Sequence, residues 1–214
     1  PPGSHNGLFN DYEVYRTTEL RGKYFLHQKF ELNLIVPFLN NTENYNNQSS
    51  TIGGLGDINI FAGYHLLRKL EEGKINQRLI GGLGVKLPSG NNEAKSEQGL
   101  IYVNPFQTGT GSTDGFIYLN YIIGIKNFGV SINSYYKFNG QNNRQESIAN
   151  SSTQFLNIFY KVDITKRLKM IPSFQTSYEF TNGEKYKGVE TGVHQTNNVL
   201  TGVGLDIFVK NIGL

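Results

Sequence analysis

Apolar and polar residues alternate with a period of two along most of this chain. Between residues 30 and 38 every even-numbered position is apolar, whereas Glu31 and Asn33 lie between them. Between residues 58 and 66 the even positions are again apolar, and Asn59 and His65 fall at odd positions. Because a β-strand points successive side chains to opposite faces, each segment has one apolar face and one polar face. The pattern predicts an all-β fold.

This alternation predicts about nine strands, and no segment of comparable length has a helical period. The strands are expected at residues 11–26, 29–39, 55–67, 77–88, 114–126, 128–139, 153–164, 168–180 and 198–210. Most exceed the usual strand length of about 5–6 residues, and they match the roughly 9–11 tilted residues that cross a bilayer. We therefore expect the apolar face of each strand to face lipid.

The connections between these strands alternate in length, which is typical of an outer-membrane barrel with short periplasmic turns and long outer loops. Short connections are expected at residues 27–28, 127, 165–167 and 210–211, and long polar loops at 40–54, 89–113, 140–152 and 181–197. Aromatic residues near strand ends on the apolar face predict interfacial girdles. They are Tyr24, Phe38, Tyr64, Tyr136, Phe138, Tyr160, Tyr178 and Phe180. The sequence predicts an antiparallel up-and-down transmembrane β-barrel in the bacterial outer membrane.

Composition narrows the alternatives. A length of 214 residues indicates one domain, spanning 1–214. The net charge of +3, without a run of Lys or Arg, argues against a nucleic-acid partner. The absence of Cys excludes a disulfide scaffold and a Cys-based metal site. The mean hydropathy of −0.39 is compatible with a barrel, because alternating strands average to a polar value.

The direction of the first strand indicates that the barrel is incomplete at both ends of this sequence. That strand ends in a short turn, so it runs from the outside to the periplasm. Since such barrels normally begin in the periplasm, one further strand is expected before residue 11, and residues 211–214 read as the start of another. We expect a parent barrel of about 12 strands, of which this chain carries about nine, because open edges are not viable in lipid.

Three glycine-rich segments carry a resemblance to a known family. They are GGLGD at residues 53–57, GGLGVKLPSG at 81–90 and GTGS at 109–112. In this order and spacing they resemble the outer-membrane transporters of the meta-pathway of phenol degradation. TTELRGKY at 17–24, followed by a strand ending in VPF at 36–38, is similar to the members from Bacteroidetes, which are Gram-negative. The resemblance covers residues 11–140 and implies a porin-like barrel for small hydrophobic or aromatic solutes.

Other sites are not indicated. The glycine-rich segments at 53–57 and 108–113 are followed by strands, whereas phosphate-binding loops require a following helix. The four His residues lack metal-ligand spacing, and no nucleophile motif is present. We expect no metal, no cofactor and no enzymatic activity.

The polar face of the strands carries the predicted functional residues, which we expect to line a lumen. They are Glu19, Arg21, Lys23, Glu31, Asn33, Asp57, Asn59, His65, Lys86, Asn120, Asn133, Lys137, Asn157, Lys161, Asp163, Gln175, Glu179 and Asp206. Two interpretations stay open: an ion-pair network that fills the lumen, or a polar path whose charges set selectivity. The same face carries the aromatic residues Phe61, Phe116, Tyr118, Tyr135, Phe155 and Phe159, which add apolar surface inside.

Three functions follow from these features. The first is an outer-membrane porin or transporter that passes a small solute. The second is a plugged barrel that serves as a subunit or anchor of a larger envelope complex. The third is a soluble lipocalin-like barrel whose apolar face points inward. The first two imply outer-membrane lipid and lipopolysaccharide as partners.

Overall fold

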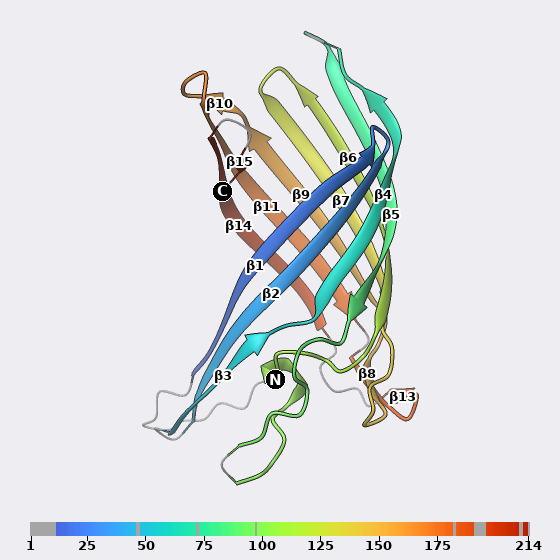
Figure 1. Cartoon of the computed structure of the whole chain (residues 1–214), viewed down its shortest axis with the longest axis vertical. Coiled ribbons are helices and arrows are strands. Elements are labelled where there is room, and N and C mark those ends of the chain that lie inside the picture. Colours follow the sequence, from blue (N-terminus) through green and yellow to red (C-terminus); the bar gives the residue numbers. More distant parts are fainter. Residues whose placement is uncertain are drawn as a thin grey trace.

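The computed structural model describes residues 12–45, 48–71, 73–96, 98–181, 183–190, 196–209 and 212–213, and it is an antiparallel sheet curled into a half-barrel (Figure 1). Neighbouring strands run up and down along the wall. In spatial order they are β1 (Tyr12–His27), β2 (Phe30–Tyr45), β4 (Ile58–Lys69), β5 (Ile75–Leu87), β6 (Asp114–Ile125), β7 (Phe128–Phe138), β9 (Ser151–Tyr160), β11 (Leu168–Thr181), β14 (Thr196–Val209) and β15 (Ile212–Gly213). The predicted all-β, antiparallel, up-and-down fold is confirmed.

The nine predicted strands are all present, and one predicted loop was wrong. Residues 40–54 were expected to form a long loop, but β2 continues to Tyr45 and the chain returns as β3 (Gln48–Leu55), paired from Phe38–Leu55 to Tyr45–Gln48. Apart from a few residues such as Ile52 and Leu55, this segment is polar on both sides, so it lacks the alternation by which the other strands were predicted. Backbone pairing and a hydrogen bond between the Thr42 and Thr51 hydroxyls, 3.1 Å apart, hold it instead.

Short and long connections are sorted to opposite ends of the wall, as predicted (Figure 1). The long-loop end carries the 3-10 helix η1 (Asn104–Phe106) and a small second sheet. That sheet contains β8 (Glu146–Ile148), β12 (Glu184–Tyr186) and β13 (Val189–Glu190), and so ties two long loops together. The two-residue strand β10 (Val162–Asp163) pairs with β11 at the other end. Within the described residues, no helix is long and apolar enough to cross a membrane.

The two faces of the wall differ as the alternation predicts. Large apolar side chains are exposed on the convex face, up to 88% for Val203, and every residue of the predicted aromatic girdles is exposed there. The buried polar residues Glu31, Asn33, His65 and Lys86 occupy the alternate positions of their strands. These positions belong to the concave face, because one cavity is lined together by Leu39 of β2 and by residues of β11 and β14 on the far side.

Glycines in β5 explain how bulky rings fit on the concave face. Phe61 of β4 and Tyr118 of β6 contact each other across β5, with ring centroids 5.6 Å apart. A Cβ at Gly82 would lie 2.3 Å from the Tyr118 ring, and one at Gly84 would lie 2.4 Å from Phe116. The rings therefore lie over bare backbone, an arrangement that protects strand glycines. Tyr135 and Phe155 extend this cluster onto β7 and β9.

We expect Gly84→Val to destabilise the sheet by about 1–3 kcal/mol, because the new side chain would collide with Phe116, with Phe61 and with the Ile60 carbonyl. The measurement is urea-induced unfolding of the refolded protein. Gly115→Val is the matched control, since a Cβ there meets no atom within 4 Å. Equal unfolding midpoints for the two variants would contradict this packing.

The wall is open along one side. Among the described residues β1 pairs with β2, and β14 pairs with β11 and, at its end, with β15, but β1 and β14 do not pair with each other. Each therefore presents a free row of backbone donors and acceptors. The expected total of about 12 strands stays a prediction.

Candidate functional site

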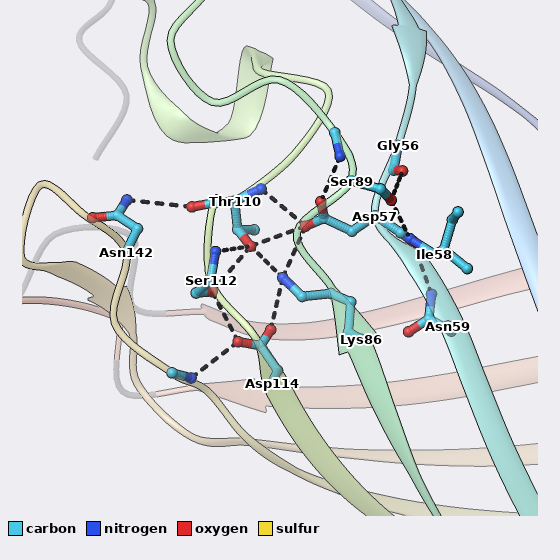
Figure 2. Close-up of polar contacts among 12 residues, drawn as sticks. Gly56, Asp57, Ile58, Asn59, Lys86, Ser89, Thr110, Ser112, Asp114 and Asn142 are labelled. Atoms are coloured by element: carbon cyan, nitrogen blue, oxygen red, sulfur yellow. Dashed lines mark hydrogen bonds and ion pairs between the residues drawn. The ribbon is translucent and has the colours of Figure 1, made fainter.

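The three glycine-rich segments singled out in the sequence meet at one place, on the concave side of the long-loop end (Figure 2). Asp57 comes from the first segment, Ser89 and Gly90 come from the second, and Thr110 comes from the third. We call this cluster, with Lys86, Ser112 and Asp114, the loop anchor. Its elements are far apart in sequence and adjacent in the sheet, because β4, β5 and β6 are neighbours.

Asp57 is the centre of the loop anchor. Its Oδ2 accepts hydrogen bonds from the Lys86 ammonium, the Thr110 backbone N–H and the Thr110 hydroxyl, each at 2.9 Å. Its Oδ1 accepts one from the Gly90 N–H at 3.0 Å. Burial opposes ionisation of this carboxyl, but the bonds from Thr110, Lys86 and Gly90 outweigh burial and hold the pKa of Asp57 below its usual range. A single carboxylate thus ties both ends of the β5–β6 loop to the start of β4.

Charges alternate across the sheet beside Asp57. The Lys86 ammonium lies 2.8 Å from Asp114 Oδ2, and Lys137 of β7 lies 3.2 Å from the same oxygen. Asp114 is 1% exposed and Lys86 is 5% exposed. Ser112 Oγ and the Gly140 N–H donate to Asp114 Oδ1, at 2.8 and 3.0 Å. Two carboxylates and two ammonium groups therefore alternate in a row from the start of β4 to β7, and all of them except Lys137, whose side chain is 33% exposed, are buried.

Close approach of backbone segments requires the glycines of the loop anchor. A Cβ at Gly109 would lie 2.5 Å from the Gly90 carbonyl carbon and 2.6 Å from Asp57 Oδ1. A Cβ at Gly56 would lie 2.3 Å from Leu39. Ser89 Oγ completes the joint, since it donates to the Gly56 carbonyl at 2.8 Å and accepts from the Ile58 N–H at 2.9 Å. The three glycine-rich segments therefore supply glycines at the places where the backbones of the β5–β6 loop and the start of β4 come close together.

The anchored β5–β6 loop folds across the concave face at its long-loop end. The Asn41 amide of β2, 1% exposed, donates to the Phe106 carbonyl in η1 at 3.0 Å. From the other side, Arg144 donates to the Asn104 side chain at 2.8 Å. A cavity of about 390 Å³ separates the loop from β11 and β14. It is lined by Leu39, Asp57, Asn104, Pro105, Gln107, Thr108, Gly109, Thr110, Glu179, Thr181, Glu184 and Asn198.

A second cluster lies at the short-turn end of the concave face. Glu31 accepts from Lys23 and from Asn33, both at 3.2 Å. The other Glu31 oxygen lies 3.1 Å from His65 Nε2. Four of the predicted lumen residues are thus brought together, and three of them are buried.

The remaining predicted lumen residues form smaller groups. Arg21 pairs with Glu19 on β1, and Asn120 donates to Asn133 between β6 and β7. Lys161 lies 3.5 Å from Asp163 at the short-turn end. The others are single residues: Asn59 donates to the Asp57 carbonyl at 3.2 Å, Asn157 is half-buried, Glu179 lines the cavity, and Gln175 and Asp206 are exposed.

Sequence reasoning missed Asp114, Thr110, Ser112 and Asn41. Asp114 could have been found, since it shares the even-numbered face of its strand with Phe116, Tyr118 and Asn120. Thr110 and Ser112 lie in a loop, where no periodicity marks which side chains turn inward. Asn41 lies in the part of β2 that the sequence predicts to be a loop.

In the part of the chain that the structure describes, no group of three or more His, Asp or Glu side chains is placed to hold a metal ion. The loop anchor is a closed set of ion pairs, and every charge in it has a partner.

No family model matches this chain, and no curated protein matches it either. The fold and the loop anchor therefore stand on the sequence and the geometry alone. The resemblance to the phenol meta-pathway transporters of Bacteroidetes stays a prediction.

Proposed function

We propose that this chain forms the wall of an outer-membrane β-barrel that passes a small solute through a lumen narrowed by the β5–β6 loop. The observation that carries the proposal is the division of the sheet into an exposed apolar convex face and a polar concave face. In water such an outer face would drive aggregation, whereas in a bilayer it is matched to lipid. Closure of the free edges of β1 and β14 by further strands completes this proposal.

The concave face is filled unevenly, which supports a path beside β11 and β14. The face of β4 to β7 carries Phe61, Tyr118, Tyr135 and the loop anchor. The corresponding positions of β11 and β14 include Ser173, Ser177, Gly202 and Gly204, which are small. The cavity lies on this side, between the β5–β6 loop and β11 and β14. Polar and acidic groups line it, so solute passage is proposed to occur there.

The second candidate is a plugged barrel that anchors a larger envelope complex. The observation that favours it is the largely buried ion-pair row from Asp57 to Lys137, which ties the β5–β6 loop to the concave face. Planar-bilayer recordings separate the two functions, because a plugged barrel conducts no ions.

We expect the full-length protein to form channels in planar bilayers, and Gly202→Trp to lower their conductance by at least half. A Cβ at Gly202 meets nothing closer than 3.9 Å, so a large side chain can enter the open part of the lumen without a collision at its base. Single-channel conductance in symmetric salt is the measurement.

Val203→Trp is the matched control, because the neighbouring residue lies on the opposite face and is 88% exposed. A larger side chain on that face adds no bulk to the lumen, so this variant should conduct like the parent protein. Absence of any channel would overturn solute passage and leave the plugged barrel. Equal conductance of the Gly202→Trp and Val203→Trp variants would show that the solute path does not run along β14.

A further inference from the structure

A β-bulge in β4 turns one arginine toward the concave face. The pairing of β4 with β5 runs regularly to His65–Ile80 and resumes at Leu67–Leu79, so that Leu66 is the extra residue. One extra residue reverses the alternation of every position after it. Arg68, which would otherwise share the lipid-facing side, is thereby placed opposite Arg78 and on the same face as the buried Ile80.

The two arginines form a pair of like charges that has no counter-charge among the residues the structure describes. Arg68 and Arg78 are direct cross-strand partners, and like charges in that position repel each other and destabilise a sheet. Within the described residues neither guanidinium makes an ion pair or a hydrogen bond. Two described acidic groups at this end of the wall are engaged elsewhere: Glu71 pairs with Lys74 at 2.5 Å, and Glu31 pairs with Lys23 and His65.

A buried imidazole faces the same space. Arg68, Arg78 and His65 line one cavity of about 420 Å³ at the short-turn end, together with Phe25, His27 and Gln28. His65 is 5% exposed, and its Nε2 lies against Glu31. Its Nδ1 is buried without a hydrogen-bond partner. Burying a polar atom without a partner is unfavourable, and the ring that carries this nitrogen borders the cavity. With Nε2 against the Glu31 carboxylate, Nδ1 becomes a donor for an anion when both ring nitrogens are protonated.

We propose that this cavity binds a small oxyanion, a carboxylate or a phosphate, between the guanidinium groups of Arg68 and Arg78. Guanidinium groups match the geometry of both oxyanions and bind them through paired hydrogen bonds. The bound anion replaces the repulsion between the two arginines with two attractive contacts. The rings of His65 and Phe25, whose centroids are 6.2 Å apart, line the same cavity. The proposal rests on the proposed function in one respect, namely that the anion arrives through the lumen.

The test is calorimetric titration of the full-length protein, purified in detergent, with sodium phosphate and separately with sodium butyrate. We expect one of these probes to bind, and Arg68→Gln and Arg78→Gln each to weaken binding about tenfold, since charge-assisted hydrogen bonds are lost. Arg167→Gln is the matched control. Arg167 is an exposed arginine at the same end of the wall, in the turn before β11, and its substitution should leave binding unchanged.

Thermal unfolding distinguishes a loss of anion binding from a loss of folding in these variants. Without added anion, Arg68→Gln should unfold at the same temperature as the parent protein or higher, because a repulsion is removed. Added phosphate or butyrate should raise the midpoint of the parent protein and not that of the variant. Failure of both probes to bind the parent protein, or binding that Arg68→Gln and Arg78→Gln leave intact, would overturn the anion site. Neither the titration nor the thermal unfolding depends on conductance, so failure of the anion site and failure of the proposed channel are distinguishable.

Discussion

Leu119→Arg is expected to prevent stable assembly of the wall in a bilayer, with a loss of about 2–4 kcal/mol of folding free energy. Leu119 is the sixth of the 12 residues of β6, and its side chain is 46% exposed on the convex face. In the proposed membrane orientation, a guanidinium there would lie near the bilayer midplane, far from either interface. Folding into lipid vesicles, followed by the mobility of unheated samples on denaturing gels, measures the effect.

Gln175→Arg is the control for this substitution, because it places the same charge on the concave face. Gln175 is exposed there and lies beside Gly202. Asn120, the inner neighbour of Leu119, is a less suitable control, because it donates a hydrogen bond to Asn133. Equal assembly of the Leu119 and Gln175 variants would mean that the convex face does not meet lipid.

Lys86→Met is expected to lower the free energy of unfolding by about 3–5 kcal/mol, the usual effect of removing one partner of a buried ion pair. Asp57 and Asp114 would each lose an ammonium group within 3 Å. Asp57 would keep only uncharged hydrogen-bond donors, and the β5–β6 loop would be held less firmly. Urea-induced unfolding of the refolded protein gives the magnitude.

Two further variants make this result specific to the buried row. Lys161→Met removes an ammonium group from a half-exposed pair whose closest N–O distance is 3.5 Å, and should change stability by less than about 1 kcal/mol. Adding Asp57→Asn to Lys86→Met should restore part of the loss, since one uncompensated charge is removed. If Lys86→Met lowered the free energy of unfolding by less than about 1 kcal/mol, the ion pairs of Lys86 with Asp57 and Asp114 would be solvated rather than buried.

The strict alternation of apolar and polar residues was sufficient to predict the fold from the sequence. Every strand with one apolar face was predicted to within a few residues, because a buried or lipid-facing side imposes a fixed register. The same logic failed where both faces meet water. The outer part of β2 and most of β3 are polar, with Ile52 and Leu55 as exceptions, so pairing there depends on backbone hydrogen bonds that composition does not reveal.

The candidate site was only partly predictable, for a related reason. Alternation indicated that Asp57 and Lys86 point inward, but not that Gly90 and Thr110 would close on one carboxylate. That contact depends on how a long loop folds back. The bulge at Leu66 was also missed, because a single extra residue leaves no mark on the pattern of apolar residues once two leucines stand together.

The paired extension of β2 and β3 has a consequence for how this chain can change in length. In the wall, adding one residue to a strand exchanges its two faces. Beyond the Asn41–Ile52 pair, no side chain of the described part of β2 and β3 is buried, so such an exchange costs little there beyond the Thr42–Thr51 hydroxyl hydrogen bond. β2 has 16 residues, roughly 53 Å at about 3.3 Å per residue, which exceeds the roughly 30 Å thickness of a bilayer core. Insertions, deletions and grafted peptides should therefore be accepted in this extension more readily than anywhere along β4 to β7.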